Sequence, residues 1–216
     1  FIVYPIAVQA VGARAIVTPA KNWGHDLDAM AAAIEADTRV VFIANPNNPT
    51  GNYLNRKELS AFLAKVPDHV MVVLDEAYIE FAGADDFPDG LDFLKTYSNI
   101  IVTRTFSKAY GLAGLRFGFA VAQPQVITQL LKVKDSYNCD SLSLAAATAA
   151  IRDTTWLAEN VAKIRVTRSR LQEQLAQLGY DVIPSHANFV WCTHPEQPAE
   201  EIYEYLKANG ILVRYM

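Results

Sequence analysis

The chain has 216 residues, enough for one large domain or one and a half ordinary ones. Hydrophobic residues make up 51% and charged residues 19%, as in an ordinary globular protein, and the formal net charge is −4. This acidic balance, without any basic run, argues against a nucleic-acid partner. No apolar segment approaches the roughly 18 residues that a membrane-spanning helix needs.

Two cysteines, Cys139 and Cys192, lie far apart and form no C-x-x-C motif. We therefore expect free thiols in a reducing cytoplasm. The chain begins with Phe1 rather than Met and ends in the apolar run 211–216, which we expect to be a strand. From these two ends we expect the chain to be an internal part of a longer protein.

Apolar runs alternate with amphipathic segments over the first half of the chain. The runs predict strands at residues 15–17, 40–44, 70–74 and 100–102. Asp26 is a candidate N-cap for one helix, and Asn55 and Glu58 have the capping-box spacing for another over 56–65. Strands that alternate with helices predict an α/β fold with a mostly parallel sheet and helices on both faces.

The second half of the chain predicts a different arrangement. Helices are expected at residues 125–137, 141–151, 155–178 and 198–208, and strands at 180–183 and 188–192. The order strand, strand, helix, strand is that of a small α+β module. We place a domain boundary near Asp153, which gives a large domain over 1–152 and an incomplete small C-terminal domain over 153–216.

Polar residues lie just after the C-terminal ends of three predicted strands of the large domain. Asn48 follows the strand at 40–44, and Lys108 follows the strand at 100–102. Asp75 and Tyr78 follow the strand between them in the sequence. Because the carboxyl ends of parallel strands lie at one edge of a sheet, we expect these side chains to converge there.

Lys108 and its neighbours predict a site for an aldehyde and a phosphate. A lysine just past a buried strand can be desolvated, and its neutral amine can form a Schiff base with a carbonyl. Thr105 and Ser107 offer hydroxyls, and Arg116 offers a planar guanidinium that suits a phosphate. Pyridoxal 5′-phosphate (PLP) is a common cofactor that carries both groups.

PLP also needs partners for its ring nitrogen and its phenolic oxygen. Asp75 can pair with the ring nitrogen and keep it protonated, which makes the ring a better electron sink. Asn48 and Tyr78 can donate hydrogen bonds to the phenolic oxygen. Phe1 is a candidate for stacking on the ring, and core packing is the alternative for this residue.

Several segments of the chain resemble the signature of fold-type-I PLP-dependent aminotransferases: NPTG at 48–51, DEAY at 75–78 and TFSK at 105–108 with Arg116. Within that group the chain resembles the histidinol-phosphate aminotransferases, also in Tyr137-Asn138 and in SHANF at 185–189. The resemblance covers essentially the whole chain. It implies reversible amino transfer in histidine biosynthesis, from L-histidinol phosphate and 2-oxoglutarate to imidazole acetol phosphate and L-glutamate.

The resemblance also implies roles for individual residues. Lys108 would carry the cofactor and move the proton at the substrate Cα, with Asp75 and Tyr78 as further catalytic residues. Phe1 lies where the family usually has a stacking Tyr, and Arg214 matches an arginine that contacts the substrate's phosphate or carboxylate. We further expect a homodimer, and we expect this chain to lack the family's N-terminal part and a second substrate arginine.

Other functions stay open at the level of the sequence. An aromatic-amino-acid aminotransferase or a threonine-phosphate decarboxylase of the same fold would share these motifs, because the motifs contact the cofactor rather than the substrate. A non-catalytic nucleotide-binding α/β module is a third alternative, but neither G-x-G-x-x-G after a strand nor G-x-x-x-x-G-K-[ST] is present. A metal hydrolase is disfavoured, since the four histidines are scattered and form no H-E-x-x-H.

Overall fold

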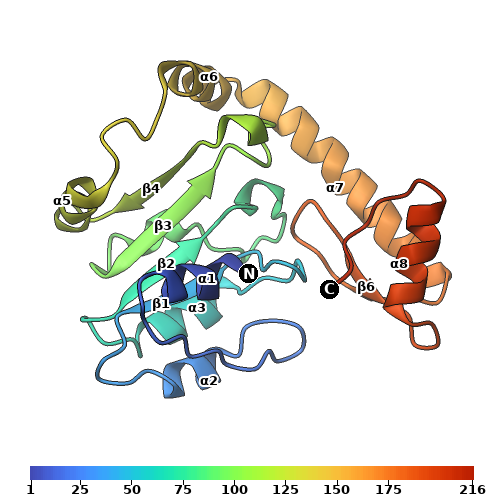
Figure 1. The fold of residues 1–216 in the computed structure, drawn as a ribbon, viewed down its shortest axis with the longest axis horizontal. Helices are drawn as coiled ribbons and strands as arrows, with labels where there is room; N and C mark the ends of the chain where they lie inside the picture. The colour runs from blue at the N-terminus through green and yellow to red at the C-terminus, as the bar shows by residue number, and fades with distance from the viewer.

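A four-stranded sheet forms the centre of the larger part of the computed structural model, which describes residues 1–216 (Figure 1). The strands lie in the order β1 (Val40–Ala44), β2 (Met71–Asp75), β3 (Ile100–Thr105) and β4 (Gly118–Ala122). The first three run parallel, and β4 is antiparallel to β3. The predicted mostly parallel α/β sheet is confirmed, with one strand, β4, that the sequence analysis did not predict.

The register of the parallel strands brings their carboxyl ends to one edge of the sheet. Ala44 pairs with Asp75, and Asp75 pairs with Thr103. The loops that carry Asn48 and Lys108 therefore start beside the end of β2. This common edge is where a mostly parallel sheet binds ligands.

Helices cover both faces of the sheet because alternate strand residues point to opposite sides. The core on one face packs strand side chains against α2 (Leu27–Ala32) and α3 (Arg56–Leu63), and its fully buried members include Ile43, Leu59, Phe62, Val72, Leu74 and Val102. On the opposite face of the sheet, Phe42 of β1 stacks on Tyr4 of α1 (Val3–Ala10), with ring centroids 4.9 Å apart. Each fully buried aliphatic or aromatic side chain stabilises such a core by roughly 1.5–3 kcal/mol.

The predicted helix starts in the first half are confirmed by their caps. The carboxylate of Asp26 accepts a hydrogen bond from the backbone N–H of Ala29. Asn55 and Glu58 form the complete capping box at the start of α3. These side chains satisfy backbone donors that the first helical turn leaves without partners.

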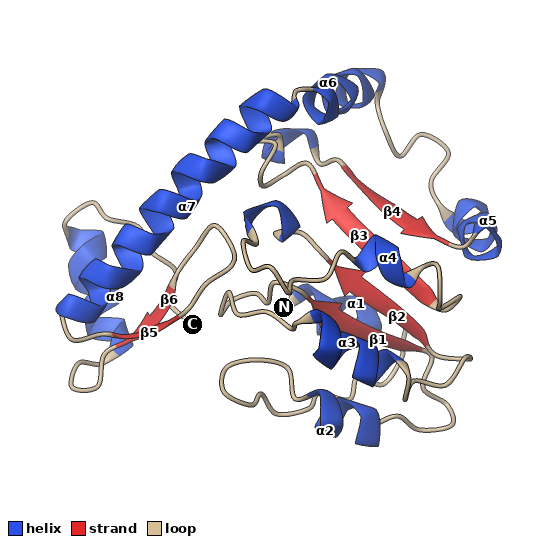
Figure 2. Ribbon diagram, turned by 180° about the vertical axis from the view of Figure 1, so that it is seen from behind, coloured by secondary structure: helices blue, strands red, loops and turns tan.

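A long helix, α7 (Thr154–Gln177), leads from the sheet to a small module (Figures 1 and 2). Asp153 caps this helix by accepting a hydrogen bond from the N–H of Trp156. The small module contains a two-stranded antiparallel sheet and one helix: β5 (Asp181–Ile183), β6 (Trp191–Thr193) and α8 (Ala199–Ala208). The division into two domains at Asp153 stays a prediction.

The remaining elements are short or lie at the margin of the sheet. They are η1 (Ile79–Phe81), α4 (Gly90–Phe93), η2 (Ala113–Leu115), α5 (Pro124–Val133) and α6 (Ser141–Arg152). None of the helices in the chain is both long enough and apolar enough to cross a membrane.

Two predicted strands are wrong. Residues 15–17 and 211–216 are extended or irregular segments that pair with no strand. A strand needs a neighbour to complete its backbone hydrogen bonds, and an apolar sequence alone does not supply one. Val17 and Leu212 are accordingly about four-fifths exposed.

Candidate active site

A cavity of about 1210 Å³ lies between the carboxyl edge of the sheet and the small module. Both ends of the chain reach it, which agrees with the neighbouring N and C marks in Figure 1. The residues singled out from the sequence all line it: Phe1, Asn48, Asp75, Tyr78, Thr105, Ser107, Lys108, Arg116 and Arg214. The structure therefore brings together side chains from five separate stretches of sequence, and their individual roles stay predictions.

Asp75 stands at the end of β2 and accepts hydrogen bonds on both carboxylate oxygens. The hydroxyl of Tyr4 donates to Oδ2 at 2.7 Å, and the backbone N–H of Ala77 donates to Oδ1 at 3.2 Å. Two donors, one on each oxygen, hold the carboxylate in one orientation. A fixed negative charge thus faces the cavity at the end of the central strand.

Tyr78 and Asn48 form a second polar pair in the cavity wall. The amide Nδ2 of Asn48 donates to the hydroxyl of Tyr78 at 2.8 Å. Tyr78 is only 6% exposed, and its ring packs edge-on against Phe189 of the small module. Because the Tyr78 oxygen already accepts from Asn48, its own proton is available for an acceptor in the cavity.

Lys108 extends from the loop after β3 into the open cavity. Its ammonium nitrogen lies 5.4 Å from the centroid of the Tyr78 ring, close enough for a cation–π contact. The residue is exposed, so the desolvation expected from the sequence is wrong for this structure. The physical reason is its place on the loop after β3, where the side chain lines a cavity instead of packing into the core.

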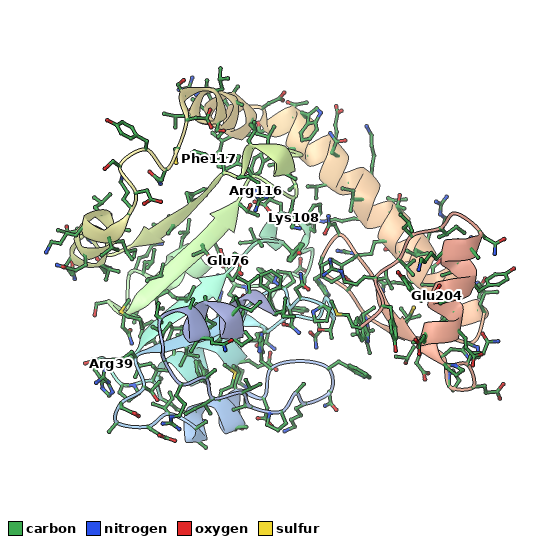
Figure 3. All side chains as sticks on the ribbon, in the orientation of Figure 1. Arg39, Glu76, Lys108, Arg116, Phe117 and Glu204 are labelled. Atoms are coloured by element: carbon green, nitrogen blue, oxygen red, sulfur yellow. The ribbon has the colours of Figure 1, made fainter.

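The turn between β3 and β4 carries Arg116, which lines the same cavity as Thr105 and Ser107. Thr105 pairs with Gly118 across the two antiparallel strands, so the chain returns to the same edge eight residues after Lys108. Figure 3 shows Lys108 and Arg116 near this edge, with Arg39 at the opposite end of the sheet. The guanidinium of Arg116 is exposed and donates within the chain to the carbonyl of Ala113 at 2.9 Å.

Backbone geometry makes the same turn compact. Arg116 adopts a left-handed conformation with φ of 53°, which a non-glycine residue rarely does. The Thr105 hydroxyl accepts a hydrogen bond from the N–H of Ser107 at 3.0 Å. A Cβ on Gly118 would lie 2.8 Å from the carbonyl oxygen of Arg104, so only glycine fits there. Two hydroxyls and one guanidinium from this turn line the same cavity, and such groups suit a phosphate.

A buried ion cluster next to Asp75 was not predicted from the sequence. Two nitrogens of Arg104 donate to Oε2 of Glu76 at 2.9 and 2.8 Å, and the N–H of Gly90 donates to Oε1 at 2.7 Å. Arg104 also pairs with Asp89 at 2.6 Å. Burial raises the pKa of Glu76 to about 7, against the lowering effect of the Arg104 guanidinium. This cluster ties the end of β2 to β3 and to the start of α4.

The small module is attached to the sheet edge through backbone carbonyls. Arg168 of α7 donates to the carbonyls of Phe81 and Ala187 at 3.1 and 2.7 Å. The N–H of His186 donates to the carbonyl of Gly51 at 2.7 Å, in the same loop as Asn48. These contacts position the far wall of the cavity against the loop that carries Asn48.

Two predicted residues stay less constrained than the others. Phe1 packs edge-on against Tyr4, with ring centroids 5.5 Å apart, and is 47% exposed. Arg214 lies in the exposed C-terminal segment of the cavity wall. Tyr4 itself was missed, and the only sequence signal was its place three residues after Phe1, at the start of α1.

The fold and the cavity define an α/β protein with a polar ligand site at the carboxyl edge of its sheet. Residues 3–216 match the sequence profile of the family described as aminotransferase class I and II. The chain belongs to this family.

Curated relatives extend the comparison. The chain is 53% identical over 214 residues to histidinol-phosphate aminotransferase 2 of Pseudomonas fluorescens strain Pf0-1, and 49% identical to the protein of that name from Pseudomonas aeruginosa. Each alignment covers 99% of this chain and 58% of the relative. The chain therefore spans somewhat over half the length of these relatives.

Solved structures share the fold. The crystal structure of histidinol-phosphate aminotransferase from Sinorhizobium meliloti, in complex with pyridoxal-5′-phosphate, superposes with a TM-score of 0.93 at 32% identity. It covers 99% of this chain, which corresponds to 59% of that protein. Histidinol-phosphate aminotransferase from Clostridium acetobutylicum gives a TM-score of 0.90 at 26% identity, over 98% and 64% of the two chains.

Proposed function

We propose that the protein to which this chain belongs is a PLP-dependent histidinol-phosphate aminotransferase. The proposed reaction transfers the amino group of L-histidinol phosphate to 2-oxoglutarate, giving imidazole acetol phosphate and L-glutamate. One observation carries the chemistry: an amine, a carboxylate, a phenol–amide pair, and a guanidinium with two hydroxyls line a single cavity. The names of relatives at about 50% identity support the substrate.

The donor set of the cavity fits PLP group by group. Lys108 offers the amine, and Asp75 offers a charged acceptor for the ring nitrogen. Asn48 and Tyr78 offer donors for the phenolic oxygen, while Arg116 with the Thr105–Ser107 hydroxyls suits the phosphate. When bound, PLP supplies an electron sink for the negative charge that develops at the substrate Cα.

The proposed role of Lys108 is to hold the cofactor and to move a proton at its Nζ. The side chain reaches the cavity from a loop fixed at both ends by β3 and β4, so its amine is presented at a defined place. Its Nζ lies beside the Tyr78 ring and makes no hydrogen bond or ion pair within the chain. An amine without such a partner is free to react with a carbonyl and then to accept a proton.

The proposed role of Asp75 is electrostatic. Its carboxylate is oriented by Tyr4 and by the N–H of Ala77, and an ionised carboxylate keeps a pyridine nitrogen protonated. Tyr78 has a spare hydroxyl proton because Asn48 supplies the hydrogen bond that its oxygen accepts. The Tyr4–Asp75 and Asn48–Tyr78 hydrogen bonds are already formed in the protein without a ligand. Asp75 and Tyr78 are therefore oriented before the cofactor binds.

Two further residues that line the cavity, Arg214 and Phe1, are proposed to contact the substrate and the cofactor ring. Arg214 lines the cavity opposite the sheet edge and can contact a phosphate or a carboxylate of the substrate. Phe1 is proposed to stack on the cofactor ring. A homodimer and a cytoplasmic location belong to the same proposal and rest on the resemblance to the enzyme family, with both cysteines free in agreement.

A half-reaction tests this function. The full-length protein is loaded with PLP and given L-histidinol phosphate, phenylalanine or tyrosine without a keto acid, and the absorbance of the cofactor is followed. We expect the absorbance of the bound cofactor to change at a far lower concentration of histidinol phosphate than of either amino acid. Conversion mainly with phenylalanine or tyrosine would move the protein to the aromatic aminotransferases, and release of carbon dioxide from threonine phosphate would make it a decarboxylase.

A further inference from the structure

Tyr4 makes the shortest hydrogen bond to the Asp75 carboxylate, across 71 positions of sequence. The hydroxyl lies 2.7 Å from Oδ2, and Tyr4 lines the same cavity as Asp75. Tyr4 belongs to α1 and Asp75 to the end of β2, so two separate elements meet at this bond. The other contact to the carboxylate comes from the neighbouring backbone of Ala77 and would exist without α1.

The Tyr4 ring is fixed on both of its sides. It stacks on Phe42 with an interplanar angle of 16°, and Phe1 packs edge-on against it. Phe42 precedes Ala44 by two residues on the same face of β1, and Ala44 pairs with Asp75 in the sheet. The hydroxyl therefore reaches the carboxylate from a ring that the sheet itself supports.

Tyr4 acts as a donor to Asp75 over the whole working range of pH. Burial, and next the negative charge of Asp75, raise the pKa of the Tyr4 hydroxyl. The hydroxyl consequently stays protonated, and its proton points to the only acceptor it has within the chain.

We propose that Tyr4 is a positioning residue, which holds the Asp75 carboxylate oriented toward the ring nitrogen of the cofactor. The inference rests on the proposed function and adds a residue that touches Asp75 rather than the reacting atoms. A carboxylate oxygen has two lone pairs, so Oδ2 can accept from Tyr4 and from a ring N–H at the same time. Loss of the hydroxyl leaves the carboxylate with one backbone donor and freedom to rotate.

The test compares Tyr4→Phe, Asp75→Asn and the double variant in the full-length protein. Tyr4→Phe keeps the ring that stacks on Phe42, so the fold is retained. We expect kcat to fall roughly tenfold, as for one hydrogen bond to a charged group, with little change in KM. The dissociation constant of PLP, measured by fluorescence titration of the apoprotein, should rise by a similar factor. In the Asp75→Asn background, Tyr4→Phe should have little further effect.

A matched control separates positioning from a structural role. If the Tyr4 hydroxyl acts by orienting Asp75, the loss of kcat and of PLP affinity should require the Asp75 carboxylate, which the double variant measures. Tyr53→Phe is the matched control, because Tyr53 also donates to an aspartate, Asp86, at 2.6 Å, but away from this cavity. That variant should leave kcat and the PLP affinity unchanged.

The outcomes are distinct. Unchanged kcat and PLP affinity in Tyr4→Phe, tighter PLP binding, or equal effects of Tyr4→Phe with and without the Asp75 carboxylate would each overturn the role of Tyr4. Those results leave the proposed function in place, since the wild-type protein would still bind PLP and turn over. A wild-type protein that does not bind PLP would remove the proposed function and the role of Tyr4 together.

Discussion

The amide of Asn48 donates a hydrogen bond of 2.8 Å to the hydroxyl of Tyr78, although the two residues follow different strands. The bond orients the Tyr78 oxygen and leaves its proton to be donated into the cavity. Tyr78→Phe should therefore weaken PLP binding roughly tenfold, because one hydrogen bond is lost while the buried ring stays in place. Fluorescence titration of the apoprotein measures this, and unchanged affinity would exclude contact between Tyr78 and the cofactor.

Asp75→Asn keeps the shape of the side chain and removes its charge. If Asp75 keeps the ring nitrogen protonated, kcat should fall by about two to four orders of magnitude, the range of a preorganised electrostatic group. Single-turnover kinetics at saturating PLP isolate this effect from weaker cofactor binding. A rate near that of the wild type would show that the charge of Asp75 plays no part in the reaction.

Arg116→Lys keeps one positive charge at the same left-handed position but loses the planar fork. Lysine carries a similar backbone cost at this φ, so the comparison reports on the guanidinium alone. We expect the PLP dissociation constant to rise by about tenfold, with pyridoxal lacking the phosphate affected little in either protein. Equal affinity of both proteins for PLP would argue that Arg116 does not hold the phosphate.

Arg104→Met leaves the buried Glu76 carboxylate without its cation. Glu76 is only 3% exposed and Arg104 16%, so the loss should cost about 3–5 kcal/mol in the free energy of unfolding. Urea denaturation measures it. The double variant with Glu76→Gln should recover much of the loss, because the amide can still accept from Gly90. A loss below about 1 kcal/mol would be that of a surface ion pair and would contradict the buried cluster.

The same cluster predicts a pH dependence of stability. Burial raises the pKa of Glu76 in the folded chain from 4.5 to about 7, so the folded state binds the proton more tightly than the unfolded state. The stabilisation from protonated Glu76 is complete below about pH 4.5 and is lost as the pH rises through about 7. Removal of Arg104 should therefore cost less at pH 5 than at pH 8.

The sequence predicted the parallel strands and the residues at their ends for a simple reason. Continuous apolar runs such as 70–74 need burial on both faces, and the polar residues that follow them must then lie at the sheet edge. The caps at Asp26 and Asn55 were predictable because each is a local contact within four residues. Local contacts and burial patterns are what a single sequence carries.

The remaining features depend on contacts between distant positions. β4 (Gly118–Ala122) is a short apolar run that begins with glycine directly after a glycine-rich turn, and its antiparallel pairing with β3 is a contact that no local pattern signals. The Tyr4–Asp75 bond joins residues 71 positions apart, and Arg104 gives no sign in the sequence that it is paired with Glu76. The exposure of Lys108 was also not predictable, because the cavity that it lines is formed together with distant residues of the small module.

The most direct test of the account is the site of covalent attachment of PLP. The full-length protein is incubated with PLP, reduced with borohydride, digested and analysed by mass spectrometry, with Lys108→Ala as the control. We expect a phosphopyridoxyl group on Lys108 alone, and loss of the label together with loss of turnover in Lys108→Ala. A label on another lysine, or turnover that survives Lys108→Ala, would contradict the assignment of this cavity as the active site.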